Sequence, residues 1–202
     1  MKTIVEKTGL LPLLFSILLF LALCGLFWHF TIDDAYITFR YADNVARGLG
    51  PVFNPGERVE GYTSFSWMLL MAAARVVQWD PVLAAKILGM ACSLLTMVVT
   101  YKLAWFVSRW PRPVAWLAVL GLGTSSALAL NTVMGLETPF YTLLLALAVL
   151  CLFREAEGGG WWPSTLLFAL AALTRPEGLA VFGLTWLYQI LFGRERGRVA
   201  LL

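Results

Sequence analysis

Two adjacent aspartates, Asp33 and Asp34, are the residues of this chain best suited to acid–base chemistry. They come soon after an apolar run over residues 10–30. Neighbouring carboxylates beside a low-dielectric surface repel each other, so one of them gains basicity and can accept a proton from a hydroxyl group, or the pair holds a cation. A capping box formed by Thr31 and Asp34 at a helix start is the structural alternative. It explains only one of the two acids, which favours a chemical role.

Two short motifs place further charge at turns between apolar segments. GLETP at 135–139 should present Glu137 near the N-terminus of a helix, where a solvated turn acid is the alternative. TRPEG at 174–178 puts Arg175 beside the start of another helix. A guanidinium group next to a helix N-terminus suits the phosphate of a lipid. A structural ion pair between Arg175 and Glu177 is the alternative.

The charged stretch over residues 32–62 contains the remaining candidates. Its first part predicts an amphipathic surface helix that ends soon after Arg47, in which Asp43 can pair with Arg40 and Arg47. NPGE at 54–57 predicts a type II turn. The side chains expected to bind substrate, in this stretch and at the two motifs, are Arg40, Arg58, Glu60, Tyr62, Glu137, Arg175 and Glu177.

The composition is that of a membrane protein. Apolar residues make up 60% of the 202 residues, charged residues 13%, and the mean hydropathy is +0.78, whereas about a quarter of a typical soluble domain is charged. The net charge of +3 comes from arginines spread over short loops, a pattern typical of topology signals and not of a nucleic-acid surface. His29 is the only histidine, which excludes histidine triads and histidine-rich metal sites.

Six apolar segments predict an all-α polytopic membrane protein. Segments 10–30, 82–107, 114–133 and 137–153 are long enough to span a hydrocarbon core, which takes about 20 residues. Segment 64–79 has only a short clean apolar part and is expected to lie at the interface. The sixth region, 161–192, is interrupted by the TRPEG motif, and we expect this break to be recessed in the membrane.

The distribution of basic residues predicts the orientation in the membrane. If 64–79 does not span, the basic residues of the N-terminus, the short loops and the C-terminal tail share one side, which is then cytoplasmic. Residues 31–81 become an exterior first loop bearing juxtamembrane helices, together with the turns at Glu137 and Arg175. We expect residues 1–202 to form a single transmembrane module with a cytoplasmic N-terminus.

One long stretch and two short motifs resemble the bacterial GT-C superfamily of polyprenyl-phosphate-sugar glycosyltransferases: DDAYITFRYADNVARGLGPVFNPGERVEGYTSFSW, then GLETP, then LTRPEG. The most similar branch is that of the terminal arabinofuranosyltransferases of mycobacterial cell walls. Protein O-mannosyltransferases and lipid A aminoarabinose transferases are more distant relatives. The resemblance covers the chain from its first helix onward.

This resemblance implies an inverting hexosyl or pentosyl transfer from a polyprenyl-phosphate sugar at the outer face of the bacterial cytoplasmic (inner) membrane. The acceptor would be a hydroxyl group of a cell-envelope glycan, lipid or protein, with membrane lipids as surroundings and no nucleic acid. The catalytic acids of the family fall on Asp33 and Asp34, with Asp33 favoured as the base, its second exterior acid on Glu137 and its phosphate-contacting cation on Arg175. No cofactor is implied with certainty; a divalent cation, if one is used, would fall on Asp33, Asp34 and Glu137.

The chain departs from the superfamily in length. Members continue with further spanning helices, so residues 1–202 are expected to correspond to the N-terminal half, truncated at the C-terminus. The alternative function is that of a non-catalytic membrane module, such as a lipid carrier or scaffold, or of an inactive fragment. Charges gathered on one face favour surface chemistry over a transport path through the membrane.

Overall fold

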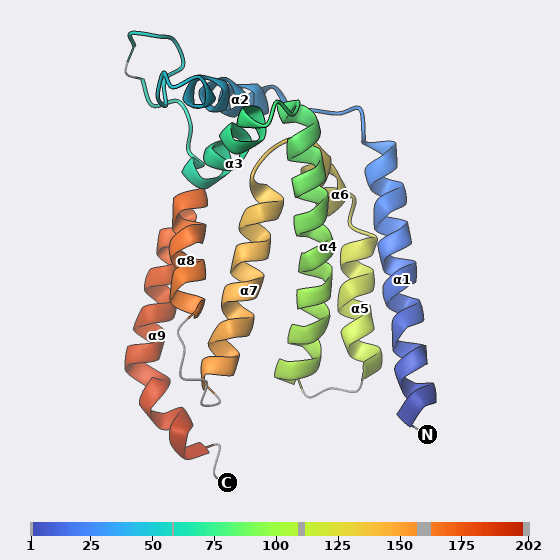
Figure 1. Ribbon diagram of the computed structural model, residues 1–202. Coiled ribbons are helices and arrows are strands. Elements are labelled where there is room, and N and C mark those ends of the chain that lie inside the picture. Colours follow the sequence, from blue (N-terminus) through green and yellow to red (C-terminus); the bar gives the residue numbers. More distant parts are fainter. Residues whose placement is uncertain (1, 58, 109–111, 157–162, 200–202) are drawn as a thin grey trace.

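The computed structural model describes residues 2–57, 59–108, 112–156 and 163–199, and this part of the chain is helical with no strand. Figure 1 shows long helices that run side by side, with α2 and α3 lying across one end. The helices are α1 (Lys2–Leu26), α2 (Asp33–Ala46), α3 (Phe65–Val76), α4 (Pro81–Ser108), α5 (Arg112–Gly123), α6 (Ser126–Val133), α7 (Thr138–Ala156), α8 (Pro163–Thr174) and α9 (Glu177–Val199).

The two ends of the bundle differ in what they contain. The α6–α7 link and the α8–α9 turn lie at the same end as α2 and α3, whereas α1 begins and α9 ends at the opposite end (Figure 1). Contacts of α3 with both α2 and α8 hold this arrangement together. The GLETP and TRPEG motifs therefore lie at the same end as the charged stretch. This agrees with the prediction that the first loop and both turns are on one side of the membrane.

Two helical stretches are long and apolar enough to cross a membrane, Pro81–Trp105 in α4 and Thr138–Glu155 in α7. A third span exists if the bent pair Ala115–Gly123 and Ser126–Val133 counts as one. Shorter apolar helices cover Leu11–Leu26, Phe65–Val76 and Pro163–Thr174. The described helices therefore support a helical membrane protein with two or three candidate spans. The presence of six apolar membrane segments stays a prediction.

The apolar segment 114–133, predicted to be long enough to span, is not one continuous helix. The segment bends by 55° between α5 and α6. Ser125 has extended backbone geometry, and its side chain accepts a hydrogen bond from the Leu128 amide at 3.1 Å. This is an N-cap, which satisfies one of the amide groups that a new helix start leaves without a partner. A polar cap within an apolar run thus divides it into two helices.

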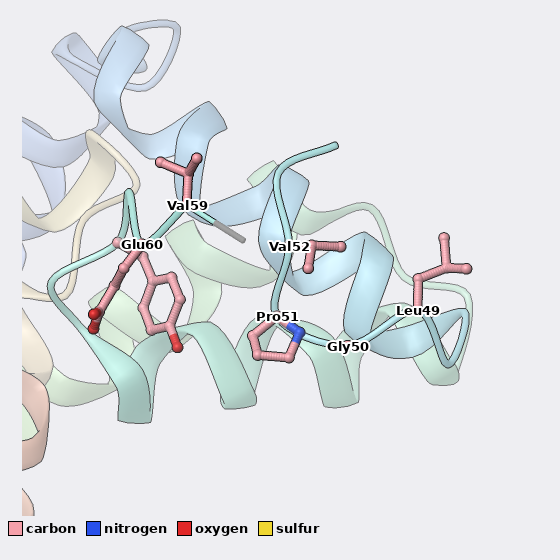
Figure 2. A pocket seen from close by; sticks show the side chains of 7 residues that line it. Leu49, Gly50, Pro51, Val52, Val59 and Glu60 are labelled. Carbon is pink, nitrogen blue, oxygen red and sulfur yellow. The ribbon is translucent and has the colours of Figure 1, made fainter. Parts of the chain in front are cut away.

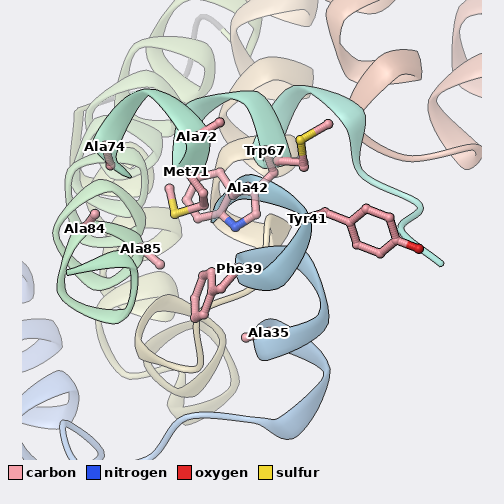
Figure 3. Packing of buried hydrophobic residues seen from close by; sticks show 11 residues of the cluster. Ala35, Phe39, Tyr41, Ala42, Trp67, Met71, Ala72, Ala74, Ala84 and Ala85 are labelled. Carbon is pink, nitrogen blue, oxygen red and sulfur yellow. The ribbon is translucent and has the colours of Figure 1, made fainter. Parts of the chain in front are cut away.

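The core nearest the charged stretch is built from α2, α3 and the start of α4 (Figure 3). Trp67 and Met68 of α3 are fully buried there, and full burial of one such apolar side chain stabilises a fold by roughly 1.5–3 kcal/mol. The cluster consists of Ala35, Phe39, Tyr41, Ala42, Trp67, Met68, Met71, Ala72, Ala74, Ala84 and Ala85. It fixes the position of α2 on the helical bundle.

The end of α2 follows the sequence prediction. Arg47 is the C-cap and Gly48 has a φ of +78°. The Gly48 amide donates to the Val45 carbonyl at 3.0 Å and the Leu49 amide to the Asn44 carbonyl at 2.9 Å. This pair of bonds is the Schellman motif, for which glycine is favoured because it adopts positive φ without strain.

Candidate active site

The first turn of α2 carries the two aspartates. Ile32, in extended conformation, is the N-cap, and no side chain caps the helix. The capping-box interpretation of Thr31 and Asp34 is therefore wrong; the Ile32 amide instead donates to the Met134 carbonyl oxygen at 3.1 Å. Asp33 and Asp34 are both exposed, and the helix dipole favours negative charge at this position. Both carboxylates are accessible to a substrate.

The GLETP turn packs against this first turn of α2. Gly135 has a φ of +97°, and a Cβ atom added there would lie 2.9 Å from the Cβ of Ala35. Buried Trp67 donates from Nε1 to the Gly135 carbonyl oxygen at 3.1 Å. The turn that carries Glu137 is thus held from two sides against the helix that carries the aspartates.

Arg175 lies between two carboxylates. Its Nη1 is 3.6 Å from Oε1 of Glu137, and its Nε is 3.5 Å from Oε2 of Glu177. Nη1 also donates to Thr138 Oγ1 at 3.5 Å, and the guanidinium group lies 5.8 Å from the centre of the Tyr141 ring. All of these contacts are longer than the roughly 2.7–2.9 Å of a strong charge-assisted hydrogen bond. The cation is therefore loosely held and has donors left for an anion.

Burial separates the two carboxylates around Arg175. The Glu137 side chain is 10% exposed, that of Glu177 is 64% exposed, and that of Arg175 is 34% exposed. Glu137 is therefore not a solvated turn acid. The pKa of Glu177 is lowered by a hydrogen bond from its own backbone amide and then by Arg175. The predicted Arg175–Glu177 pair is present, but Glu137 is the buried partner that the cation reaches from a different turn.

Lys86 of α4 holds the chain segment just before α2. Its Nζ donates to the carbonyl oxygens of Trp28, at 2.5 Å, and Phe30, at 3.0 Å, and lies 5.4 Å from the centre of the Trp28 ring. The residue is 5% exposed. Lys86 therefore does not extend to solvent, because its charged group is buried against carbonyl groups just after the first helix.

Asp43 joins α2 to α3. Its Oδ2 is 2.7 Å from Nη2 of Arg47, and its Oδ1 is 2.8 Å from Nη2 of Arg75. The predicted pair with Arg47 is confirmed, but Arg40 points elsewhere and donates from Nε to the Phe53 carbonyl oxygen at 3.1 Å. Arg40 therefore shapes the loop after α2 rather than the helix surface.

The α2–α3 loop contains the other predicted substrate-binding residues. The Glu57 amide donates to the Asn54 carbonyl at 3.2 Å and Gly56 has a φ of +90°, which confirms the type II turn. Glu60 and Tyr62 line an open pocket (Figure 2). Arg58 lies outside the described residues.

The described residues bring some of the predicted site together and leave other parts apart. Glu137, Arg175 and Glu177 form one cluster, and Glu137 belongs to the turn that contacts the start of α2. Among the described residues no group of three or more His, Cys, Asp or Glu side chains is placed to hold a metal ion. The combination of Asp33, Asp34 and Glu137 is therefore not supported as a metal site by this geometry.

Sequence reasoning missed the residues that position the site. Trp67 and Lys86 each donate to backbone carbonyl oxygens of another segment. Trp67 is the last residue of the long stretch that carries the family resemblance but was not singled out there, and Lys86 belongs to no motif. The one sequence signal for Lys86 was the position of a charged residue in the first turns of an apolar helix, which indicates a buried partner. Its partners lie 56 and 58 positions away, so only the fold identifies them.

Comparison with known proteins relates part of the chain to an enzyme. A stretch of 68 residues, 33% of this chain, is 44% identical to the terminal β-(1→2)-arabinofuranosyltransferase of Mycobacterium tuberculosis. The match covers 11% of the length of that protein. No family model and no solved structure matches the chain.

Proposed function

We propose that the chain acts as a membrane glycosyltransferase that moves a sugar from a polyprenyl-phosphate donor to a hydroxyl group of a cell-envelope acceptor. The observation that supports this function most directly is the loosely held, one-third exposed guanidinium group of Arg175 beside buried Glu137. Both residues lie on turns at the same end of the bundle as the aspartates. The partial identity with an arabinofuranosyltransferase supports the reaction class and a pentosyl donor.

The reaction divides between the two parts of the site. One of the aspartates, Asp33 in the first instance, takes the proton of the acceptor hydroxyl group, as a general base does. The hydroxyl oxygen forms a new bond to the anomeric carbon, and the bond from that carbon to the phosphate oxygen breaks with inversion. The lipid phosphate departs with the electron pair, and no proton donor is required because the phosphate is already a good leaving group.

Arg175 is assigned to the phosphate. A guanidinium group offers several N–H donors in a fixed fork that matches phosphate oxygens. Glu137 and Glu177 offset its charge in the structure, so a phosphate that approaches would compete with Glu177, the exposed partner, for these donors. Glu137 holds the guanidinium group in place from the buried side.

We place the reaction at the outer face of a bacterial cytoplasmic membrane, with the α2–α3 end exterior and the start of α1 cytoplasmic. The single end that gathers α2, α3 and both charged turns supports this orientation (Figure 1). Members of the proposed class take their donor from the lipid bilayer, so a site at the exterior end of the spans can receive both a lipid donor and a water-borne acceptor.

A transfer assay tests the function. Membrane vesicles that contain the full chain are incubated with radiolabelled polyprenyl-phosphate arabinose, and separately with the mannose donor, in the presence of an oligosaccharide acceptor. Label should move to the acceptor, and vesicles without the chain serve as the control. If neither donor gives transfer above the control, the chain is instead a non-catalytic membrane module.

A further inference from the structure

A pocket of about 550 Å³ lies between two segments of the α2–α3 loop. One wall runs from Leu49 to Val52 and the other contains Val59, Glu60 and Tyr62, and Figure 2 shows the two walls facing each other over α2 and α3. Its volume falls within the roughly 300–1,000 Å³ of small-molecule sites. The chemistry of a ligand can therefore be inferred from the walls.

The first wall is fixed by two polar side chains of α2, of which one is buried and one is exposed. Asn44, 1% exposed, donates from Nδ2 to the carbonyl oxygens of Val52 at 2.7 Å and Phe53 at 3.0 Å. Arg40 donates to the same Phe53 oxygen. Because a buried amide without a partner costs about 1–3 kcal/mol, the wall is held in one position.

The second wall is fixed by Tyr41, which is 1% exposed. Its hydroxyl group donates to the Val59 carbonyl oxygen at 2.6 Å and accepts from the Gly61 amide at 2.9 Å. The ring of Tyr62 packs on that of Tyr41 with 4.9 Å between ring centres. One helix thus positions both walls, and the pocket is formed before any ligand binds.

The polar groups of the pocket suit an uncharged polyol. Among the described residues that line the pocket, Glu60 supplies the single carboxylate, and none is a lysine or arginine. Burial and then the Glu60 carboxylate raise the pKa of Tyr62, and its hydroxyl group is a hydrogen-bond donor at neutral pH. A carboxylate acceptor, a phenol donor and apolar walls are complementary to sugar hydroxyl and C–H groups, whereas the carboxylate repels a phosphate.

We propose that this pocket binds an uncharged sugar unit of the acceptor, while the anionic donor is bound at Arg175. The assignment to the acceptor rests on the proposed transferase function. The binding of a neutral sugar can be measured without transfer, so the two ideas can fail separately.

Calorimetric titration of the detergent-solubilised full chain tests the proposal, with an arabinan oligosaccharide, a mannan oligosaccharide, and the arabinan oligosaccharide carrying a terminal phosphate. One of the neutral probes should bind, and the phosphorylated probe should bind more weakly. Glu60→Gln should weaken binding of the neutral probe by about tenfold through loss of a charge-assisted hydrogen bond. It should also reduce the difference in affinity between the neutral and the phosphorylated arabinan probes. Tyr62→Phe, which keeps the ring on Tyr41, should weaken binding by about fivefold.

Glu57→Gln is the matched control, because Glu57 is an exposed acid of the same loop that does not line the pocket; it should bind as the parent does. The proposal would be overturned if neither neutral probe binds, or if the phosphorylated probe binds more tightly than the neutral one. It would also be overturned if the Glu60→Gln and Tyr62→Phe variants bind the neutral probes as tightly as the parent does. Transfer with an unchanged acceptor KM in both variants would also overturn it and leave the proposed function standing. If a neutral sugar binds and the two variants weaken its binding, but neither donor gives transfer, the pocket binds sugar and the proposed transferase function is wrong.

Discussion

Glu137 and Arg175 approach each other across two turns that are 38 positions apart in the sequence, with Oε1 3.6 Å from Nη1. The carboxylate is nearly buried and the guanidinium group is half-buried. A buried charge that loses its partner is destabilising, because its desolvation is no longer offset. The pair therefore links the α6–α7 turn to the α8–α9 turn, and it should contribute to both stability and donor binding.

Arg175→Gln should raise the KM for the proposed polyprenyl-phosphate donor by about tenfold, through loss of the cation to which we assign the phosphate. It should also lower the free energy of unfolding by about 1–2 kcal/mol, because Glu137 loses its partner while the long distance and partial exposure of Arg175 limit the loss. Donor titrations and thermal unfolding in detergent measure the two effects.

The double variant Arg175→Gln, Glu137→Gln is the control for stability. With the buried charge removed, part of the lost stability should return, so that the coupling energy of the two sites is about 0.5 kcal/mol or more. Strict additivity of the two single changes would mean that the pair does not contribute to stability.

Gly135→Ala should destabilise the protein by about 1–2 kcal/mol and reduce transfer. A side chain there must adopt a positive φ and also displace Ala35 in the first turn of α2. Gly121→Ala is the matched control, since a Cβ atom at Gly121 of α5 meets nothing within 4 Å. It should leave the protein unchanged or stabilise it by up to about 1 kcal/mol, and a Gly135→Ala variant as stable as this control would contradict the packing described for the turn.

Lys86→Met should destabilise the protein by about 2 kcal/mol, because the carbonyl groups of Trp28 and Phe30 lose their donor in a buried position. Thermal unfolding of the solubilised chain measures the loss. Lys102→Met, at the exposed far end of the same helix, should change stability by no more than about 0.5 kcal/mol. Equal effects of the two changes would argue against a special role for Lys86 at the start of the aspartate-bearing segment.

Cysteine labelling tests the orientation. In a background without the native cysteines, Glu57→Cys should react with a membrane-impermeant thiol reagent added outside intact cells, whereas Arg154→Cys, at the far end of α7, should react only after the membrane is opened. The cysteine-free parent serves as the control. Labelling of both positions from the same side would contradict the assignment of residues 31–81 to the exterior.

Local signals in the sequence predicted the parts of the fold that depend on backbone conformation. The end of α2 at Gly48 and the type II turn at Gly56 follow from glycine in positions of positive φ. The interruption at Arg175 and Pro176 follows from charge and proline within an apolar run. These features arise from neighbouring residues, so a pattern of a few residues is enough to predict them.

Features that depend on distant partners could not be predicted in the same way. The partner of Asp43 in α3, Arg75, lies 32 positions away. Helical spacing suggested Arg40 and Arg47, and of these only Arg47 pairs with Asp43. The bend at Ser125 could not be predicted from the sequence, because small residues in an apolar run are equally typical of closely packed continuous helices. The approach of Arg175 to Glu137 follows only from the packing of α8 and α9 beside α7.

The role of the adjacent aspartates is tested most directly by the rate of sugar transfer in the Asp33→Ala and Asp34→Ala variants. Both residues are exposed in the first turn of α2, so either change should leave the fold intact. Radiolabelled polyprenyl-phosphate arabinose is supplied at saturation, and transfer to the oligosaccharide acceptor is followed over time. At least one variant should be slower by about 10²–10⁴-fold, the contribution of a general base, with donor binding retained. Transfer at the parent rate by both variants would contradict the assignment of the base.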